Sequence, residues 1–197
     1  WGQLLVTSAE KSNNITFAHG VTRTPANAEE FCSKYKIALT DNFESVLVNP
    51  AIDAVVLATP HTQHFDQITK AAQAGKHIYC EKPYSLSRAE AAEALFAVAD
   101  AAVKTAVGHN RRFAPNYQKM QAMIVDGTLG EIIQIEGHFS ANLALEGGAW
   151  RSNREESPAG GMTSLGIHLV DAFINMFGRV SEVRAYSKSL ATSYDID

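Results

Sequence analysis

The sequence lacks the features that mark several large classes of protein. It has only two cysteines, Cys32 and Cys80, without metal-type spacing, so no disulfide framework is indicated and we expect a reduced, cytoplasmic setting. No apolar run approaches the roughly 20 residues that a membrane-spanning helix needs. The net charge of −4 is mild and comes with neither a basic stripe nor an acidic tail. We therefore expect no nucleic-acid partner and no membrane partner.

The first half of the chain alternates between strand-like and helix-like segments. Hydrophobic residues make up 46% of the chain and charged residues 19%, which is enough for a packed core. The patterns predict strands at 15–21, 54–58, 77–80 and 105–108, and helices at 25–35, 62–74 and 87–102, the second closed by Gly75. This alternation is typical of right-handed βαβ units. It predicts an α/β fold, a Rossmann-type doubly wound parallel sheet, in residues 1–110.

The pattern changes after residue 110, where we expect a second domain, 111–197. It predicts helices at 114–125 and 163–177, the latter ending at Gly178, and alternating strands at 131–142 and 180–189, with a turn at 126–130 and a loop at 146–161. These elements favour a second domain of the α+β class. The chain opens at Trp1 and Gly2 with a helix-compatible run and no strand before it. We therefore expect a first domain without its first strand.

Polar residues follow the predicted strands at the edge of the sheet where ligands bind in this architecture. Lys82 is the most informative, because it comes directly after a buried strand and precedes a rigid proline. Its ammonium could stabilise a developing alkoxide. A surface Glu–Lys pair before a turn is an equally good interpretation from spacing alone. The segments at this edge are Thr22–Arg23, Thr59–His61, Glu81–Pro83 and His109–Arg111.

Four motifs, in order and with matching spacing, carry a family resemblance over nearly the whole chain. They are AGKHIYCEKP (74–83), ATPHTQH (58–64), NRRFAP (110–115), and WR (150–151) followed by GG (160–161) and GIHLVD (166–171). Together they resemble the glucose–fructose oxidoreductase / inositol dehydrogenase (Gfo/Idh/MocA) family. The resemblance implies an NAD(P)-dependent oxidoreductase that acts on CH–OH groups of a sugar, cyclitol or related polyol. It also implies that the second domain is an α+β substrate domain with a mainly antiparallel sheet and that the chain is truncated at both ends. The full-length protein is then expected to be a homo-oligomer, either a dimer or a tetramer.

The same resemblance implies roles for individual residues. Lys82 matches the catalytic lysine, with a cis bond to Pro83, and His168 matches the general acid/base. Without the other motifs, a core histidine would be the simpler interpretation of His168. The implied substrate contacts are Asp171, Ser164, Asn110, Arg112, Trp150 and Arg151. The implied cofactor contacts are Trp1, Gly2, Thr22, Arg23, Thr59, Pro60, His61, His64, Glu81, Lys82 and Arg111.

Two departures from the family pattern bear on the chemistry. Ser164 stands where the family often carries an aspartate, so either Lys82 and His168 suffice, or Asp171 substitutes, or the chemistry differs from the inositol type. Thr22, followed by Arg23, stands where NAD-preferring members carry an acid. A guanidinium there could bind a 2′-phosphate, so the sequence favours NADP over NAD as cofactor.

Three alternatives remain open at the level of sequence. His61 and His64 form a His-x-x-His pair. Without cysteines or clustered carboxylates nearby in the sequence, this pair is only weak evidence for a zinc site, and we expect no metal. A family member that keeps its dinucleotide bound could instead give net hydrolysis or epimerisation. A non-catalytic dinucleotide sensor has only Ser164 in its favour, and the retention of Lys82 and His168 argues against it.

Overall fold

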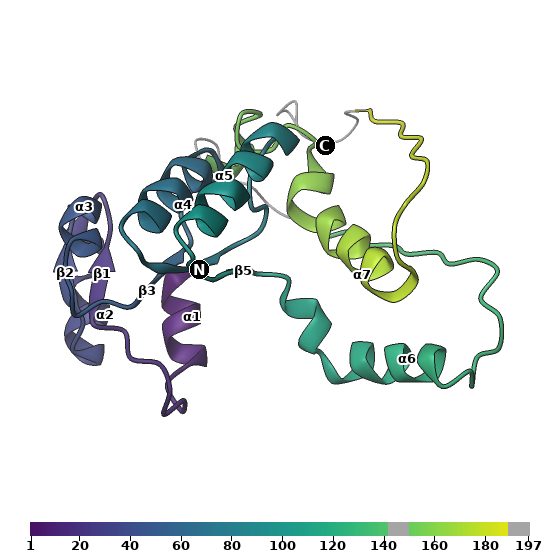
Figure 1. Cartoon of the computed structure of the whole chain (residues 1–197), viewed down its shortest axis with the longest axis horizontal. Helices are drawn as coiled ribbons and strands as arrows, with labels where there is room; N and C mark the ends of the chain where they lie inside the picture. The colour runs from purple at the N-terminus through teal and green to yellow at the C-terminus, as the bar shows by residue number, and fades with distance from the viewer. Residues whose placement is uncertain (142–149, 189–197) are drawn as a thin grey trace. The chain divides into compact units, whose positions relative to one another are not determined.

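The computed structural model describes residues 1–141 and 150–188, which form parts of two compact units (Figure 1). The first unit comprises Trp1–Thr59, Gln63–Glu81 and Ser87–Ala106, and the second comprises Pro60–Thr62, Lys82–Leu86 and Val107–Asp197. Two short loop segments that follow strands in the sequence thus belong to the second unit. No helix in the described ranges is long and apolar enough to span a bilayer.

The elements alternate in the first half of the chain. In order they are α1 (Gly2–Ser8), β1 (His19–Val21), α2 (Glu29–Tyr35), β2 (Ala38–Thr40), α3 (Phe43–Leu47), β3 (Ala54–Leu57), α4 (His64–Gln73), β4 (His77–Cys80), α5 (Arg88–Asp100) and β5 (Thr105–Val107). The second half holds α6 (Pro115–Val125) and α7 (Ile167–Phe177). Single 3-10 turns lie at Pro25–Asn27, His61–Gln63, Asn110–Phe113 and Trp150–Ser152, and a π-helical turn at Met162–Gly166 precedes α7.

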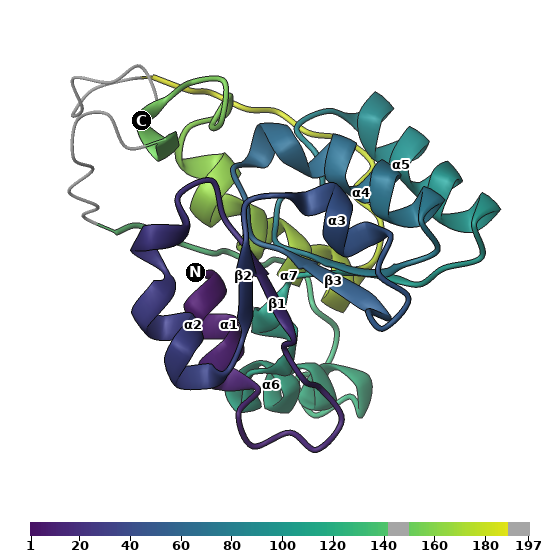
Figure 2. The same cartoon turned by 90° about the vertical axis from the view of Figure 1, so that its left-hand side faces the viewer.

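The strands form parallel sheets, as predicted. Strand β1 pairs with β2, with Gly20 opposite Leu39 (Figure 2). Strand β3 pairs with β4, with Val55 opposite Ile78, and β5 continues this second sheet. A six-stranded Rossmann sheet has the order 3-2-1-4-5-6. The two sheets follow the order of its strands 2 and 3 and of its strands 4 to 6, and no described strand joins them.

The core of the first unit is built on α4. Ile68, Ala71 and Ala72 of this helix are fully buried, as is Cys80 on β4, and α4 lies beside α5 in both ribbon views. Burial of an isoleucine side chain stabilises a fold by about 1.5–3 kcal/mol. Helix α4 ends at Gln73, one residue before the predicted end, and Gly75 follows with a φ of 70°, which glycine adopts readily.

Two predictions for the first unit were incomplete. Of the strand expected at 15–21, only His19–Val21 pairs with a neighbour. The elements β2 and α3 were not predicted at all, because segments of three and five residues are too short to show a hydrophobic period. Helix α3 nevertheless has a local start signal, since the Asn42 side chain accepts a hydrogen bond from the Ser45 amide at 2.9 Å.

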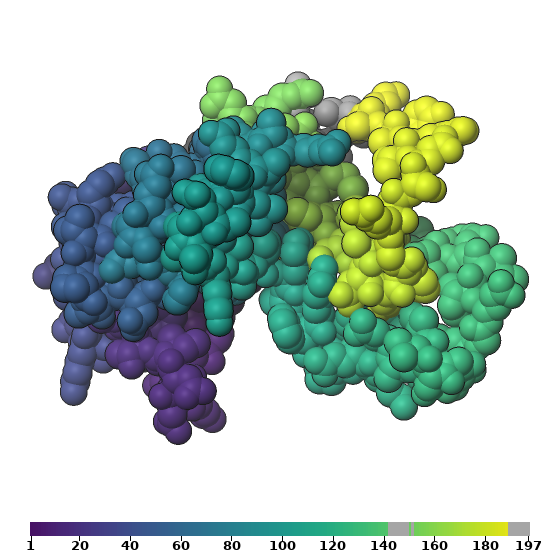
Figure 3. Space-filling model, in the orientation of Figure 1, coloured from purple at the N-terminus to yellow at the C-terminus, as the bar shows by residue number. Residues whose placement is uncertain are grey.

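The strands predicted in the second domain are wrong for the residues that the structure describes. Residues 131–141 and 178–188 form no strand, and they run as extended segments at the surface of the second unit (Figure 3, where the second is yellow). Ile133 is 94% exposed and Tyr186 is 99% exposed. An alternating pattern supplies one apolar face, but a strand also needs a partner for its backbone hydrogen bonds. The described residues supply none to either segment.

Candidate functional site

Lys82 lies directly after β4, and its ammonium is held against the turn that precedes α7. Its Nζ donates a hydrogen bond to the backbone carbonyl oxygen of Ser164 at 2.6 Å. The Lys82–Pro83 peptide bond is cis, as expected from the family resemblance. Both partners belong to the second unit. The fold therefore brings a residue from the end of a strand to the start of a helix that lies far along the chain.

His168 lies in the first turn of α7, immediately after the π-helical turn Met162–Gly166. Such single π turns are often found at functional sites. Burial lowers the pKa of His168 to about 4, and the positive charges of Lys82 and Arg111 add to this effect. The imidazole is thus uncharged near neutral pH, which is the form that can accept a proton.

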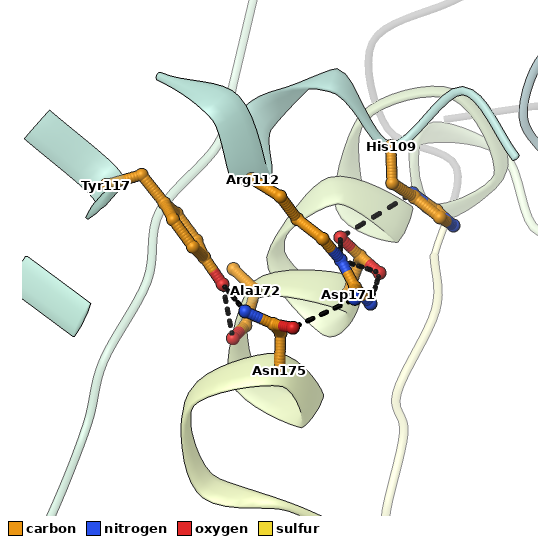
Figure 4. Close-up of polar contacts among 6 residues, drawn as sticks. All are labelled: His109, Arg112, Tyr117, Asp171, Ala172 and Asn175. Carbon is orange, nitrogen blue, oxygen red and sulfur yellow. Dashed lines mark hydrogen bonds and ion pairs between the residues drawn. The ribbon is translucent and has the colours of Figure 1, made fainter. Parts of the chain in front are cut away.

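Asp171 and Arg112 are bound to each other (Figure 4). Arg112 Nε donates to the two carboxylate oxygens of Asp171 at 3.1 and 2.9 Å, and Nη2 donates to the carboxylate as well. Nη1 of Arg112 donates to Asn175 Oδ1 at 2.8 Å. Asp171 is only 8% exposed. Both residues were predicted to contact substrate, and the structure places them in a bidentate ion pair between the Asn110–Phe113 turn and α7.

The loop at Pro60–Thr62 is held by a residue that the sequence analysis missed, Glu156. The carboxylate of Glu156 accepts hydrogen bonds from the Thr62 amide at 3.0 Å and the Thr62 hydroxyl at 2.6 Å. Its backbone oxygen lies 2.6 Å from His61 Nδ1. The Trp150 ring meets the His61 ring edge-on, with centroids 4.8 Å apart. Glu156 lies in a polar loop with no motif around it, so no sequence signal could have singled it out.

The remaining predicted substrate contacts lie in the second unit, together with Arg111, which was predicted to contact the cofactor. Arg111 lies over the Phe139 ring, 5.3 Å from its centroid. Asn110 opens the 3-10 turn before α6, and Arg151 lies in the turn Trp150–Ser152. Arg111 and His168 also form part of the wall of a pocket of about 440 Å³ whose other walls are mostly apolar faces of α6, α7 and residues 135–139. Asn116, Tyr117 and Glu136 are the other polar residues that line it.

The predicted dinucleotide contacts in the first unit lie at helix starts and strand ends. Helix α1 begins at Gly2 with no side-chain cap and no acidic residue in its first turn. Apart from its chain neighbours and the backbone of its own helix, no described atom lies within 4 Å of where a side chain at Gly2 would begin. Thr22 and the exposed Arg23 follow β1. These positions leave room and open amide groups for a phosphate-bearing cofactor.

The other cofactor candidates of this unit lie deeper. His64 is fully buried, with Nε2 3.1 Å from the Thr59 carbonyl oxygen. Glu81 is 8% exposed and accepts a hydrogen bond from the Tyr79 hydroxyl at 3.2 Å. These contacts hold the ends of β3 and β4 in place. A metal site has no support in the described ranges, which contain no group of three or more His, Cys, Asp or Glu side chains that could hold an ion.

Comparison with known proteins divides the chain into two matching parts. Residues 3–109 match the model of an oxidoreductase family with an NAD-binding Rossmann fold. Residues 117–197 match the model of the GFO/IDH/MocA C-terminal domain. The two models together span nearly all of the chain.

Relatives of this chain include oxidoreductases from bacteria. Oxidoreductase P35 of Formosa agariphila is 30% identical over 180 residues, which cover 88% of this chain and 56% of that protein. Inositol 2-dehydrogenase of Rhizobium meliloti is 38% identical over 108 residues, 55% of this chain and 32% of that protein. The solved structure of a presumed NADPH-dependent oxidoreductase from Desulfitobacterium hafniense has a TM-score of 0.83 at 30% identity, covering 90% of this chain and 52% of that one. The chain thus spans about half the length of relatives that it matches along most of its own length.

Proposed function

The chain belongs to the Gfo/Idh/MocA oxidoreductase family, and from this we propose that it transfers a hydride between a nicotinamide cofactor and a secondary hydroxyl or ketone of a sugar, cyclitol or related polyol. The observation that carries the proposal is the hydrogen bond from Lys82 to the Ser164 carbonyl. It holds an ammonium beside the turn that leads into His168. A cation and an uncharged imidazole together are what alcohol oxidation requires.

In the proposed reaction, His168 accepts the proton of the substrate hydroxyl. Lys82 stabilises the oxygen as negative charge develops on it, and its bond to Ser164 keeps it oriented before substrate arrives. When bound, the nicotinamide supplies the hydride acceptor. In the reverse direction the protonated imidazole returns the proton to the carbonyl oxygen.

The dinucleotide would be held by the first unit. The start of α1 at Gly2 offers uncapped amide groups to the pyrophosphate, and Thr22 and Arg23 would lie beside the adenosine ribose. We favour NADP because Arg23 is exposed and no carboxylate stands at Thr22 or Arg23 to repel a 2′-phosphate. An Arg23→Ala variant is expected to raise the KM for NADP about tenfold, because it loses about one charge-assisted hydrogen bond. The KM for NAD is expected to stay unchanged. Equal changes for both cofactors would argue against this role of Arg23.

The test of the reaction uses the purified protein, a panel of polyols and sugars, and either cofactor, with the absorbance of reduced nicotinamide as readout. Lys82→Ala is expected to lower kcat about 10²–10³-fold, and His168→Gln about 10²–10⁴-fold, with dinucleotide affinity kept. Lys119→Ala, an exposed lysine on α6, is the matched control. Wild-type turnover in Lys82→Ala would remove Lys82 from the chemistry.

The same preparation separates the proposed reaction from the alternatives. Free exchange of the dinucleotide on gel filtration supports a dehydrogenase. Stoichiometric retention of the dinucleotide, together with product formation without net reduction, would indicate internal cofactor cycling instead. Binding of the dinucleotide without turnover of any substrate would favour a sensor.

A further inference from the structure

The guanidinium of Arg112 is fully engaged by groups on α7. It binds the Asp171 carboxylate through Nε and Nη2 and the Asn175 side chain through Nη1. Asn175 donates in turn to the Tyr117 hydroxyl at 3.0 Å, and this hydroxyl donates to the Ala172 carbonyl at 3.2 Å (Figure 4). The network ties the Asn110–Phe113 turn and α6 to one face of α7. It leaves few polar atoms of Arg112 for a substrate.

The Asp171 carboxylate also faces two histidines. Its Oδ2 lies 3.8 Å from His109 Nδ1. The His109 and His168 rings stand nearly perpendicular, with centroids 6.4 Å apart. Asp171 is three residues after His168 on α7, so the two share a face of the helix. One buried carboxylate is therefore next to both members of a histidine pair.

The charge of His168 depends on a small set of neighbours. Around it lie Lys82 from the end of β4, His109 and Arg111 from before α6, Asp171 on its own helix, and the ring of Phe139. Lys82, Arg111 and a protonated His109 disfavour the imidazolium, and Asp171 favours it. Among these charged neighbours, Asp171 is the one whose charge favours a proton on His168.

Resting on the proposed function, we propose that Arg112 is a positioning residue: it neutralises the buried carboxylate of Asp171 and so keeps His168 uncharged and ready to accept the substrate proton. Asp171 would otherwise stand as an isolated buried anion beside the histidine pair and pull a proton onto it. The role differs from direct contact with substrate. It acts on the reaction only through His168.

Substitutions of Arg112 and of Asp171 are expected to shift the pKa of His168 in opposite directions. A purely structural role of the two residues would not give opposite shifts. Arg112→Met leaves the carboxylate uncompensated and raises the pKa of His168. Asp171→Asn removes the anion, keeps the shape and leaves the guanidinium, so it lowers the pKa of His168. The double variant removes both charges and returns the pKa close to that of the wild type. Simple loosening of the site would expose His168 to water in all three variants and shift its pKa upward in each.

The experiment is a pH titration of the histidine ring signals by NMR on the full chain, labelled in the histidine rings. The protein has seven histidines, and the signal that disappears in His168→Gln assigns His168. We expect a shift of about half a pH unit or more upward in Arg112→Met, a shift downward in Asp171→Asn, and near cancellation in the double variant. Arg112→Lys keeps the charge and should restore most of the wild-type value. Arg184→Met, which removes a charge from an exposed pair with Glu182, is the control and should shift nothing.

Each result decides the proposal. Shifts of the same sign in Arg112→Met and Asp171→Asn, or no shift in either, would overturn it. If Arg112→Met does not fold, the downward shift in Asp171→Asn, absent in Arg184→Met, carries the test alone. Because the titration needs no substrate, it separates this inference from the proposed function. Opposite shifts in a protein that turns over no polyol would uphold the charge control and refute the dehydrogenase reaction.

Discussion

The Nζ of Lys82 lies 2.6 Å from the carbonyl oxygen of Ser164, so an ammonium at the end of a strand is fixed one helical turn before His168. The acceptor is a backbone atom, which means that the bond does not depend on the side chain at position 164. The serine that replaces the aspartate of the family pattern therefore leaves this contact intact. The positive charge of Lys82 contributes to the lowered pKa of His168.

The first prediction concerns the pH dependence that His168 confers. Its pKa is about 4 in the folded protein against an ordinary value of 6.5, with burial as the main cause and Lys82 next. The unfolded chain thus binds more protons than the folded one between these values, and the contribution of His168 to stability is complete above pH 6.5 and is lost as the pH falls toward 4. Urea unfolding of wild type and His168→Gln across this range should show the wild type gaining stability with pH relative to the variant. A constant difference would contradict the lowered pKa.

The same pKa sets the acid limb of activity. If the uncharged imidazole is the base, the profile of kcat/KM should fall on the acid side near pH 4 rather than near 6.5. Lys82→Met removes one of the charges that disfavour the imidazolium, so the acid limb of its residual activity should move upward. An acid limb near pH 6.5 in the wild type would show that a different group limits the rate.

The second prediction concerns Lys76, which is only 8% exposed and has a structural role. Its Nζ donates to the carbonyl oxygens of Asn49 at 2.8 Å and Ile52 at 2.7 Å, closing the turn before β3. Lys76→Met keeps the apolar stem but leaves both carbonyls unpaired. It should cost about 2 kcal/mol and lower Tm by about 4–8 °C.

Lys70→Met is the matched control for Lys76. Lys70 pairs with Glu44 and Asp66 at the surface, where exposed ion pairs contribute little. Thermal unfolding followed by circular dichroism compares the two variants. Equal Tm values for both would show that the buried position of Lys76 adds nothing.

The third prediction concerns Glu156, which is 7% exposed. Glu156→Ala removes the acceptor of the Thr62 amide and hydroxyl, and the loss of two buried hydrogen bonds should lower the free energy of unfolding by about 1–3 kcal/mol. Glu156→Gln, which keeps acceptor atoms, should lose less. The neighbouring Glu155 is exposed, so Glu155→Ala serves as control in urea unfolding. A stability of Glu156→Ala equal to that of the control would exclude this anchoring role.

The fourth prediction concerns the cysteines. Cys80 is fully buried, and burial followed by the nearby Glu81 charge raises the pKa of its thiol to about 12. At pH 8 only about one Cys80 in ten thousand is then a thiolate, so a disulfide reagent should react with it far more slowly in the native protein than in denaturant. Ser33→Cys adds an exposed thiol next to the buried Cys32 and should react at once. Fast native labelling of Cys80 would show that β4 opens readily.

The hydrophobic pattern alone was sufficient to predict most of the helices and strands of the first unit. Buried parallel strands read as short apolar runs, and helices end at residues such as Gly75 and Gly178 whose backbone angles favour glycine, so both signals are local. The motif around Lys82 was also visible in the sequence, and the family resemblance that it carries implied the cis bond to Pro83. The strands predicted at 131–142 and 180–189 did not form in the described residues, because pairing depends on a neighbour and not on the segment itself.

What the tertiary structure decided is how the polar groups of the site combine. Sequence order places Lys82 and Ser164, Arg112 and Asp171, and Thr62 and Glu156 far apart along the chain, and nothing local signals that they meet. Their bonds and the lowered pKa of His168 arise from burial and from charges brought together through space, and both depend on distance in the folded chain rather than on separation in sequence.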